Sequence, residues 1–148
     1  MPSNQKHTLD TWINWRTLTK EAVAAKLAAK PEQIETGLKY EKLDSLTKIY
    51  CPDKYPAHFY FKGDRQVMQY IGDETALRPF HASTLMKRFG EPIELDSRAG
   101  KYPHYVHPEQ GIAYSADGEQ IILLEIFPPC SLEDYLANIY EQPAPFRK

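Results

Sequence analysis

His104 and His107 are the first candidates for chemistry in this chain, because histidine is the commonest metal ligand and general base. The residues around them favour an extended strand over 102–107, in which positions three apart point to opposite faces of a sheet. Two such rings do not readily converge on one metal ion, and no third ligand stands nearby in a recognisable pattern. We therefore expect two surface or turn histidines and no metal site.

Cys51 and Cys130 are the candidates for thiol chemistry. A catalytic Cys51 would need a base, which His58 or His107 would have to supply. A turn-forming Pro-Asp pair directly follows Cys51, so no helix N-terminus is available to stabilise a thiolate. The spacing of the two cysteines matches no metal motif, and we expect free structural thiols, as in a reducing cytosol.

Glu125 interrupts the most apolar stretch of the chain, residues 121–127. Both alternating sets of this stretch are mostly apolar, which is typical of a central strand covered on parts of both faces. A carboxyl group buried there would be a candidate acid or base, since burial raises the pKa of a carboxyl group. The other interpretation places Glu125 where one face opens to water, or where Arg or Lys pairs with it.

The tyrosines suggest a recognition surface. Period-two alternation in residues 57–62 puts Phe59 and Phe61 on one face, buried against helices together with Val67, and Tyr60 on the other. An exposed tyrosine combines a large contact area with a polar tip, although tyrosine is also simply a good residue for an exposed strand. The predicted binding residues share this second face, and we expect its tyrosines to be exposed: Tyr50, His58, Tyr60, Lys62, Met68 and Tyr70.

The elements that position these residues are helices followed by antiparallel strands. Helical patterns cover 9–30 in two pieces, with the second over 19–30 and Thr19 as its cap. They also cover 80–89 and 131–140, where Ser131 and Asp134 resemble a capping box. Segment 32–42 is polar and is predicted to be a loop or extended arm. Runs of helix and then strands predict one α+β domain over 1–148, with helices 19–30 and 80–89 on one face of an antiparallel sheet of about six strands. The predicted strands are 46–51, 57–62, 66–71, 102–107, 111–115 and 121–127.

The two parts of the chain repeat the same order of features, which predicts a tandem helix-plus-meander repeat over about 19–71 and 79–128. Each part begins with a short helix that ends before a proline. Tyr60 precedes the turn at Gly63 as Tyr114 precedes the turn at Gly118.

The helix that ends in Phe89-Gly90-Glu91-Pro92 and the meander that follows carry a resemblance to known families. The arrangement resembles the small outer-membrane assembly lipoproteins of the SmpA/OmlA type and the tandem β-lactamase inhibitor proteins. The resemblance implies helices packed against an antiparallel sheet, and an open sheet face that binds another protein. The leader and lipidated cysteine of the lipoproteins are not found in this sequence, so the resemblance does not imply the membrane location of the lipoproteins.

Composition narrows the function classes further. The net charge of −2 gives no general attraction to nucleic acid, and no apolar stretch approaches the roughly 20 residues of a membrane helix. There is no glycine-rich phosphate loop, so we expect no nucleotide cofactor. The polar residues 1–8 are not expected to be a secretory signal, and we expect a cytoplasmic location. The sequence favours a non-catalytic protein-binding or adaptor domain. The alternative is a small-ligand-binding protein or enzyme with a pocket between sheet and helices.

Overall fold

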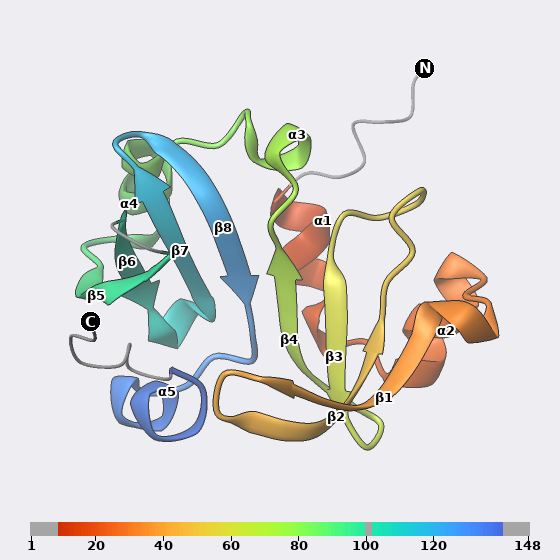
Figure 1. Ribbon diagram of the computed structural model, residues 1–148. Coiled ribbons are helices and arrows are strands. Elements are labelled where there is room, and N and C mark those ends of the chain that lie inside the picture. The colour runs from red at the N-terminus through yellow and green to blue at the C-terminus, as the bar shows by residue number, and fades with distance from the viewer. Residues whose placement is uncertain (1–8, 100–101, 141–148) are drawn as a thin grey trace, which may run out of the picture.

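The computed structural model describes residues 9–99 and 102–140 of the chain (Figure 1). These residues form one open antiparallel sheet of eight strands in the order β1-β2-β3-β4-β8-β7-β6-β5, which confirms the predicted α+β class. The strands are β1 Ile34–Tyr40, β2 Leu43–Ile49, β3 His58–Lys62, β4 Arg65–Ile71, β5 Ile93–Ala99, β6 Tyr102–His107, β7 Ile112–Asp117 and β8 Gln120–Ile126. The helices are α1 Leu9–Asn14, α2 Lys20–Leu27, α3 Glu74–Leu77, α4 Ala82–Phe89 and α5 Leu132–Asn138. Residues 1–8, for which we predict no secretory signal, lie outside the described residues.

The sheet has two more strands than the sequence predicts, and both lie at its edges. β1 occupies the segment predicted to be a loop, and the other addition is β5. The register between β1 and β2 shifts between Glu35 and Leu38 and again between Leu38 and Tyr40, where Gly37 adopts a φ of +70°. Such irregularities break the strict alternation by which strands are recognised in a sequence.

The predicted helix caps are present. The Thr19 side chain accepts a hydrogen bond from the backbone of Ala22 at 3.1 Å and begins α2. Ser131 accepts one from the backbone of Asp134 at 3.0 Å and begins α5. Each side chain satisfies a backbone N–H that the first turn of a helix leaves unpaired, so local sequence fixes where these helices start.

The two faces of the sheet are covered by different elements. α1 and α4 lie behind the sheet in Figure 1, whereas α5 lies in front. On the helix face, buried residues of α1, α2 and α4 form one core cluster with Phe59 and Phe61. On the opposite face, which we call the α5 face, a second cluster includes Met68, Phe127 and Tyr135. Phe59 and Phe61 are therefore buried on the side that the sequence predicts.

One predicted side-chain direction is wrong. Val67 is buried, but in the cluster of the α5 face. A register shift between Tyr60 and Phe61 pairs Phe61 with Gln66, and this irregularity changes the alternation along β4. Tyr60 and Tyr114, matched as repeat equivalents, lie in the clusters of opposite faces.

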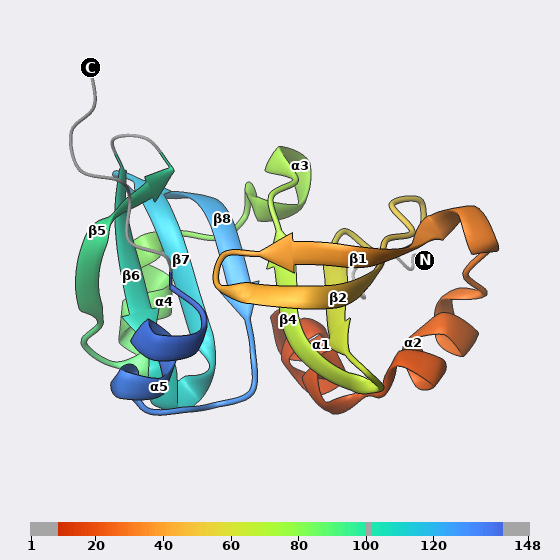
Figure 2. The same ribbon diagram turned by 60° about the horizontal axis from the view of Figure 1, so that its bottom comes forward.

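The hairpin of β1 and β2 crosses over the α5 face. Figure 2 shows both strands passing in front of β3 and β4 and ending beside β8. At the tip, the backbone N–H of Lys42 donates to Ile139 O at 3.2 Å, and Lys42 Nζ donates to Leu136 O at 2.9 Å. The hairpin tip and the end of α5 thus meet above the centre of the sheet.

The two halves of the sheet join along a short seam between β4 and β8. Pairing there comprises only Gln69 with Ile126, Tyr70 with Glu125 and Ile71 with Leu124. Beyond these pairs the strands separate. Phe127, directly after β8, donates its backbone N–H to Gly111 O at 2.9 Å and so stays with the β8 half of the sheet. The other end of β4 lies at the turn at Gly63.

The 3₁₀ turn η2 (Trp15–Thr17) spans this separation. Arg16 Nη1 donates to Gln110 O at 2.7 Å on the β8 side, and Gln66 Nε2 of β4 donates to Trp15 O at 2.8 Å. Gly111 permits this close approach, since a Cβ atom there would fall 2.1 Å from Phe127 O and 2.6 Å from Arg16 Nη1. The N-terminal segment therefore connects the two halves of the sheet.

Candidate functional site

Four of the six predicted binding residues form one continuous group of rings on the α5 face. Tyr50 stacks on His58 with ring centroids 3.7 Å apart and an interplanar angle of 11°. His58 lies 5.8 Å from Tyr70. Tyr40, which the sequence did not single out, joins Tyr60 at 5.1 Å and Tyr70 at 5.9 Å. We call these five residues the aromatic surface.

The other two predicted residues lie apart from these rings. Lys62 is exposed, and its Nζ donates to Asp44 O at 2.8 Å and lies 3.4 Å from Asp44 Oδ1. Met68 shares the α5 face but is fully buried in its core cluster. Lys62 is therefore engaged at the hairpin, and Met68 supports the sheet from inside.

The expected full exposure of Tyr50, Tyr60 and Tyr70 is wrong, because all three are half-buried. Tyr40 from β1 packs against Tyr60 and Tyr70, and Tyr50 is stacked on His58. The prediction failed because it treated segment 32–42 as a loop and so left this part of the face uncovered.

Burial keeps His58 of the aromatic surface neutral at pH 7. Burial, followed by the positive charge of Lys48, lowers the pKa of His58 from its ordinary 6.5 to about 4. Burial also raises the pKa of the Tyr60 hydroxyl. Lys48 lies beside these rings, 6.0 Å from the Tyr50 ring, and pairs with Glu35 at 3.4 Å. The surface therefore offers ring faces and neutral polar tips.

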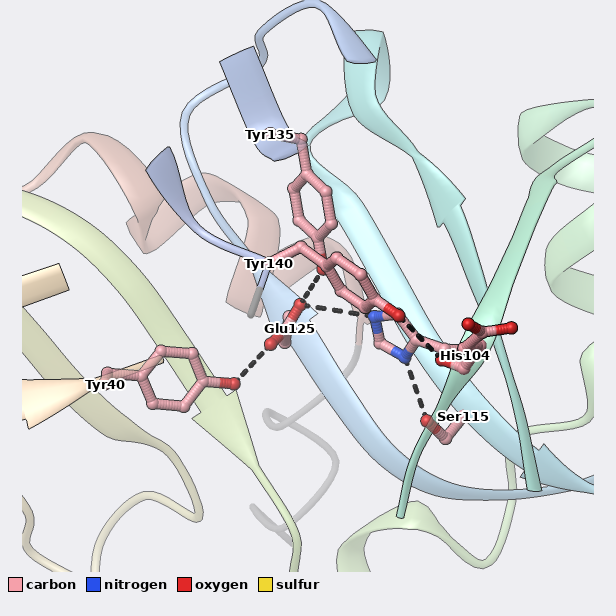
Figure 3. A network of polar contacts seen from close by, with 7 residues as sticks. Tyr40, His104, Ser115, Glu125, Tyr135 and Tyr140 are labelled. Carbon is pink, nitrogen blue, oxygen red and sulfur yellow. Dashed lines mark hydrogen bonds and ion pairs between the residues drawn. The ribbon is translucent and has the colours of Figure 1, made fainter. Parts of the chain in front are cut away.

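Glu125 lies at the centre of a buried polar network on the same face, beyond the seam (Figure 3). Its side chain is fully buried. Tyr135 of α5 donates to Oε1 at 2.7 Å, and Tyr40 of β1 donates to Oε2. His104 Nε2 lies 3.7 Å from Oε1. The hairpin, α5 and the sheet therefore meet at one carboxyl group.

His104 extends this network into the sheet. Its Nδ1 lies 2.9 Å from Ser115 Oγ, and its Nε2 lies 3.0 Å from Tyr135 Oη. Because the single hydroxyl hydrogen of Tyr135 goes to Glu125, the hydrogen between His104 and Tyr135 belongs to His104 Nε2. Tyr140 packs against the same imidazole, with centroids 6.3 Å apart, and donates to Asp96 O at 3.1 Å.

The expectation of two surface or turn histidines is wrong as to exposure, since both are buried, although His107 does directly precede the 3₁₀ turn at Pro108–Gln110. They do point to opposite faces. His107 contacts Tyr114 Oη through Nε2 at 2.9 Å on the helix face, where burial lowers its pKa. Among the described residues, no group of three or more His, Cys, Asp or Glu side chains is placed to hold a metal ion.

The geometry of the network fits a structural role. Both oxygens of Glu125 accept hydrogen bonds, and the carboxyl group has no contact with solvent. Satisfied buried networks of this kind fix one arrangement of the elements that carry them. Sequence reasoning singled out Glu125 and His104 separately, but nothing in the sequence connects them with each other or with Tyr40 and Tyr135, which come from other elements.

The two thiols also lack a catalytic environment. Both cysteines are free. Cys51 is buried, its Sγ donates to Gln33 Oε1 at 3.5 Å, and burial raises the pKa of its thiol. A raised thiol pKa reduces the thiolate population, which is the reactive form.

Three of the cavities that open on the described part of the molecule are well formed, and neither Glu125 nor His104 lines any of these three. The first has a volume of about 420 Å³ and lies where β4 and β8 separate, between Arg16, Arg65 and Pro128. The second, about 300 Å³, shares Arg65 and Pro128 with it and continues toward α5. The third, about 250 Å³, lies between Phe89 and His107.

Comparisons of the chain with protein-family models, with curated proteins and with solved structures found no match. The resemblance to the β-lactamase inhibitors and the small lipoproteins stays a prediction. Within residues 9–99 and 102–140, no helix is both long and apolar enough to cross a membrane.

Proposed function

We propose that this protein is a non-catalytic binding or adaptor protein that recognises another protein through the aromatic surface. The observation that carries the proposal is the continuous group of half-buried rings contributed by β1, β3, β4 and the residue after β2. Tyrosines of this kind supply large contact areas at low entropic cost and are enriched at protein interfaces.

The state of the ionisable groups supports binding over catalysis. Glu125 and His104 are enclosed by tyrosines and are not walls of any of the three cavities. A catalytic acid or base must reach its substrate directly or through one water molecule. An enzyme that uses this carboxyl group would have to displace α5 or the β1–β2 hairpin first.

The tandem repeat and the cellular location are part of the same proposal. We propose two tandem helix-plus-meander repeats over about 19–71 and 79–128. The proposal is supported by the pairing of β4 with β8, the last strand of each meander. A cytoplasmic location is supported by two free thiols, since a reducing compartment keeps cysteines in that state.

Affinity capture from the native cell, followed by mass spectrometry, tests the proposed function. The wild type, Tyr50→Ala, Tyr60→Ala and Tyr105→Ala would be compared. Tyr105 is the matched control because it is a half-buried tyrosine packed against the core of the helix face.

A partner enriched by the wild type and by Tyr105→Ala, and reduced with both other variants, is the expected result. Its affinity for Tyr60→Ala should be weaker by about 1–3 kcal/mol in titration calorimetry. If all four proteins retain the same partners equally, the aromatic surface is not the binding site.

A further inference from the structure

The cavity at the seam between the two halves of the sheet has the features of a ligand site. Its volume is about 420 Å³, and it lies beside η2, the β3–β4 turn and the chain that leaves β8. Leu18, Pro128 and Pro129 supply apolar walls. Ligand sites are typically clefts of this size, mostly apolar, with a few placed polar groups, and they favour junctions between structural units. This seam cavity is separate from the aromatic surface.

Two arginines line the seam cavity without a carboxylate partner. Arg16 is half-buried, and the groups that its guanidinium contacts are the carbonyl oxygens of Gln110 and Phe127, at 2.7 and 3.5 Å. Arg65 is exposed at the mouth. Neither forms an ion pair with a described carboxylate, although Asp64 also lines the cavity. Burial lowers the pKa of Arg16, which reflects the cost of holding its charge away from water.

Gln66 supplies an unused hydrogen-bond acceptor at the same place. Its side chain is 4% exposed, and its Nε2 donates to Trp15 O at 2.8 Å and to Leu18 O at 3.0 Å. These two bonds fix the orientation of the amide. Its Oε1 is buried and has no hydrogen-bond partner. A buried acceptor left unpaired is costly, so a ligand whose N–H group reaches Oε1 through a small movement of the cavity wall would gain a hydrogen bond.

We propose that the seam cavity binds an amphipathic carboxylic acid of the N-acyl amino acid type, which carries an N–H group beside its carboxylate. Arg16 and Arg65 hold the carboxylate, because a guanidinium matches its two oxygens with paired N–H donors. The walls at Leu18 and Pro128 cover the apolar side chain of the ligand. Gln66 Oε1 accepts the hydrogen bond from the ligand N–H.

Binding of N-acetyl-L-leucine, followed by calorimetry and by ¹H–¹⁵N NMR, tests the proposal. We expect saturable binding in the millimolar range or tighter, with shift changes concentrated at 16–19 and 64–66. N-acetyl-L-leucinamide has the same shape without the charge and should bind at least about tenfold more weakly, since a charge-assisted hydrogen bond is lost. 4-Methylpentanoate lacks the N–H group and should also bind more weakly.

Substitutions at the mouth test the sign of the charge. Arg65→Gln should weaken binding about two- to fivefold, as expected for an exposed ion pair. Asp64→Asn should strengthen binding by a similar factor because it removes a repelling carboxylate. Arg78→Gln, which removes an exposed charge outside the seam cavity, is the matched control and should leave binding unchanged. Arg16→Gln should reduce binding by about tenfold or more, provided that its NMR spectrum shows an intact fold.

A free small molecule and the C-terminus of a peptide share this chemistry, and a tetrapeptide ending in leucine distinguishes them. Much tighter binding of the tetrapeptide than of N-acetyl-L-leucine would assign the site to peptide termini, and equal or weaker binding would assign it to a free acid. Equal binding of N-acetyl-L-leucine and its amide, or equal effects of Arg65→Gln and Arg78→Gln, would overturn the proposal. So would the absence of saturable binding at millimolar concentration. The outcome is independent of partner capture by the aromatic surface.

Discussion

The two halves of the α5 face begin from the same strand pattern and end in different states. Over β3 and β4, the face carries Tyr60 and Tyr70, which are half-buried. Over β6 to β8, it carries His104, Ser115 and Glu125, which are fully buried. The β1–β2 hairpin covers Tyr60 and Tyr70 in part, through Tyr40, whereas α5 closes over Glu125 and His104. The comparison teaches that alternation decides which face a side chain occupies, and that the covering element decides its exposure.

The chemistry of each half follows from its cover. The hydroxyl groups of half-buried tyrosines can bond water, so they need no closed network, although the buried Nδ1 of His58 has no hydrogen-bond partner. Under α5 no solvent reaches Glu125, and each polar group there must find a protein partner. Tyr40 contacts both Tyr60 and Glu125 and therefore connects the two halves.

Glu125→Ala is expected to have the largest effect, because it breaks the buried half of the comparison. The substitution removes the acceptor that the hydroxyl groups of Tyr40 and Tyr135 share in a dry site. Loss of the central acceptor of a buried hydrogen-bond network should lower the free energy of unfolding by about 5 kcal/mol in urea denaturation, since each unsatisfied buried group costs about 1–3 kcal/mol. Glu133→Ala, an exposed position on α5, should change it by less than about 0.5 kcal/mol. A loss below about 1 kcal/mol for Glu125→Ala would mean that the network does not hold the fold.

Phe61→Ala tests the helix face, which serves as the fully buried reference for both halves of the α5 face. Phe61 is fully buried among the residues that pack on α1, α2 and α4. Truncation of Phe61 to alanine should lower the free energy of unfolding by about 3–5 kcal/mol, through lost burial of the ring and the cavity left behind. Thermal melts and urea titrations measure the change. A harmless Phe61→Ala would show that the strand register assigned to β3 is wrong.

Tyr60→Ala sharpens the comparison at the half-buried end. If Tyr60 were fully exposed, as predicted from the sequence, Tyr60→Ala would lower the free energy of unfolding by less than about 1 kcal/mol. Because Tyr60 packs against Tyr40, we expect about 1–2 kcal/mol instead, from the lost aromatic pair and part of its burial. The same urea titrations apply, and the loss should be smaller than that of Phe61→Ala. An equal or larger loss would place Tyr60 in the core.

The smallest effect concerns pH and His58. In the unfolded chain this imidazole takes up a proton near pH 6.5, whereas in the folded protein the pKa is about 4. The unfolded state therefore binds more protons between these values. The contribution of His58 is fully present above about pH 6.5 and is lost as the pH falls toward about 4. Solvent screening at this half-exposed site keeps the effect small.

His58→Gln should flatten that part of the stability–pH profile, measured by urea denaturation from neutral pH to about pH 4.5. Thr84→Gln, at an exposed position without a titrating side chain, is the matched control and should leave the slope unchanged. A slope reduced equally by both variants would contradict the shift at His58. Some slope should remain in either variant, since the pKa of His107 is lowered by burial as well.

The sequence by itself determined the local features of this protein. The caps at Thr19 and Ser131, the antiparallel strands with their tight turns, and the helix-side burial of Phe59 and Phe61 follow from short-range rules. Such rules depend on residues within one turn or one strand, so they can be applied without knowing the rest of the fold. The grouping of Tyr50, His58, Tyr60 and Tyr70 on one face was predicted by the same alternation.

Only the tertiary structure decided what covers each face and which remote groups meet. Tyr40 reaches Glu125 from 85 positions away because an irregular edge hairpin crosses the sheet. His104 is buried because Tyr135 and Tyr140 close over it. Arg16 stands at the seam because Gly111 leaves room for it beside Phe127. Contacts between distant parts of the chain depend on how whole elements pack, and no local pattern in the sequence encodes that packing.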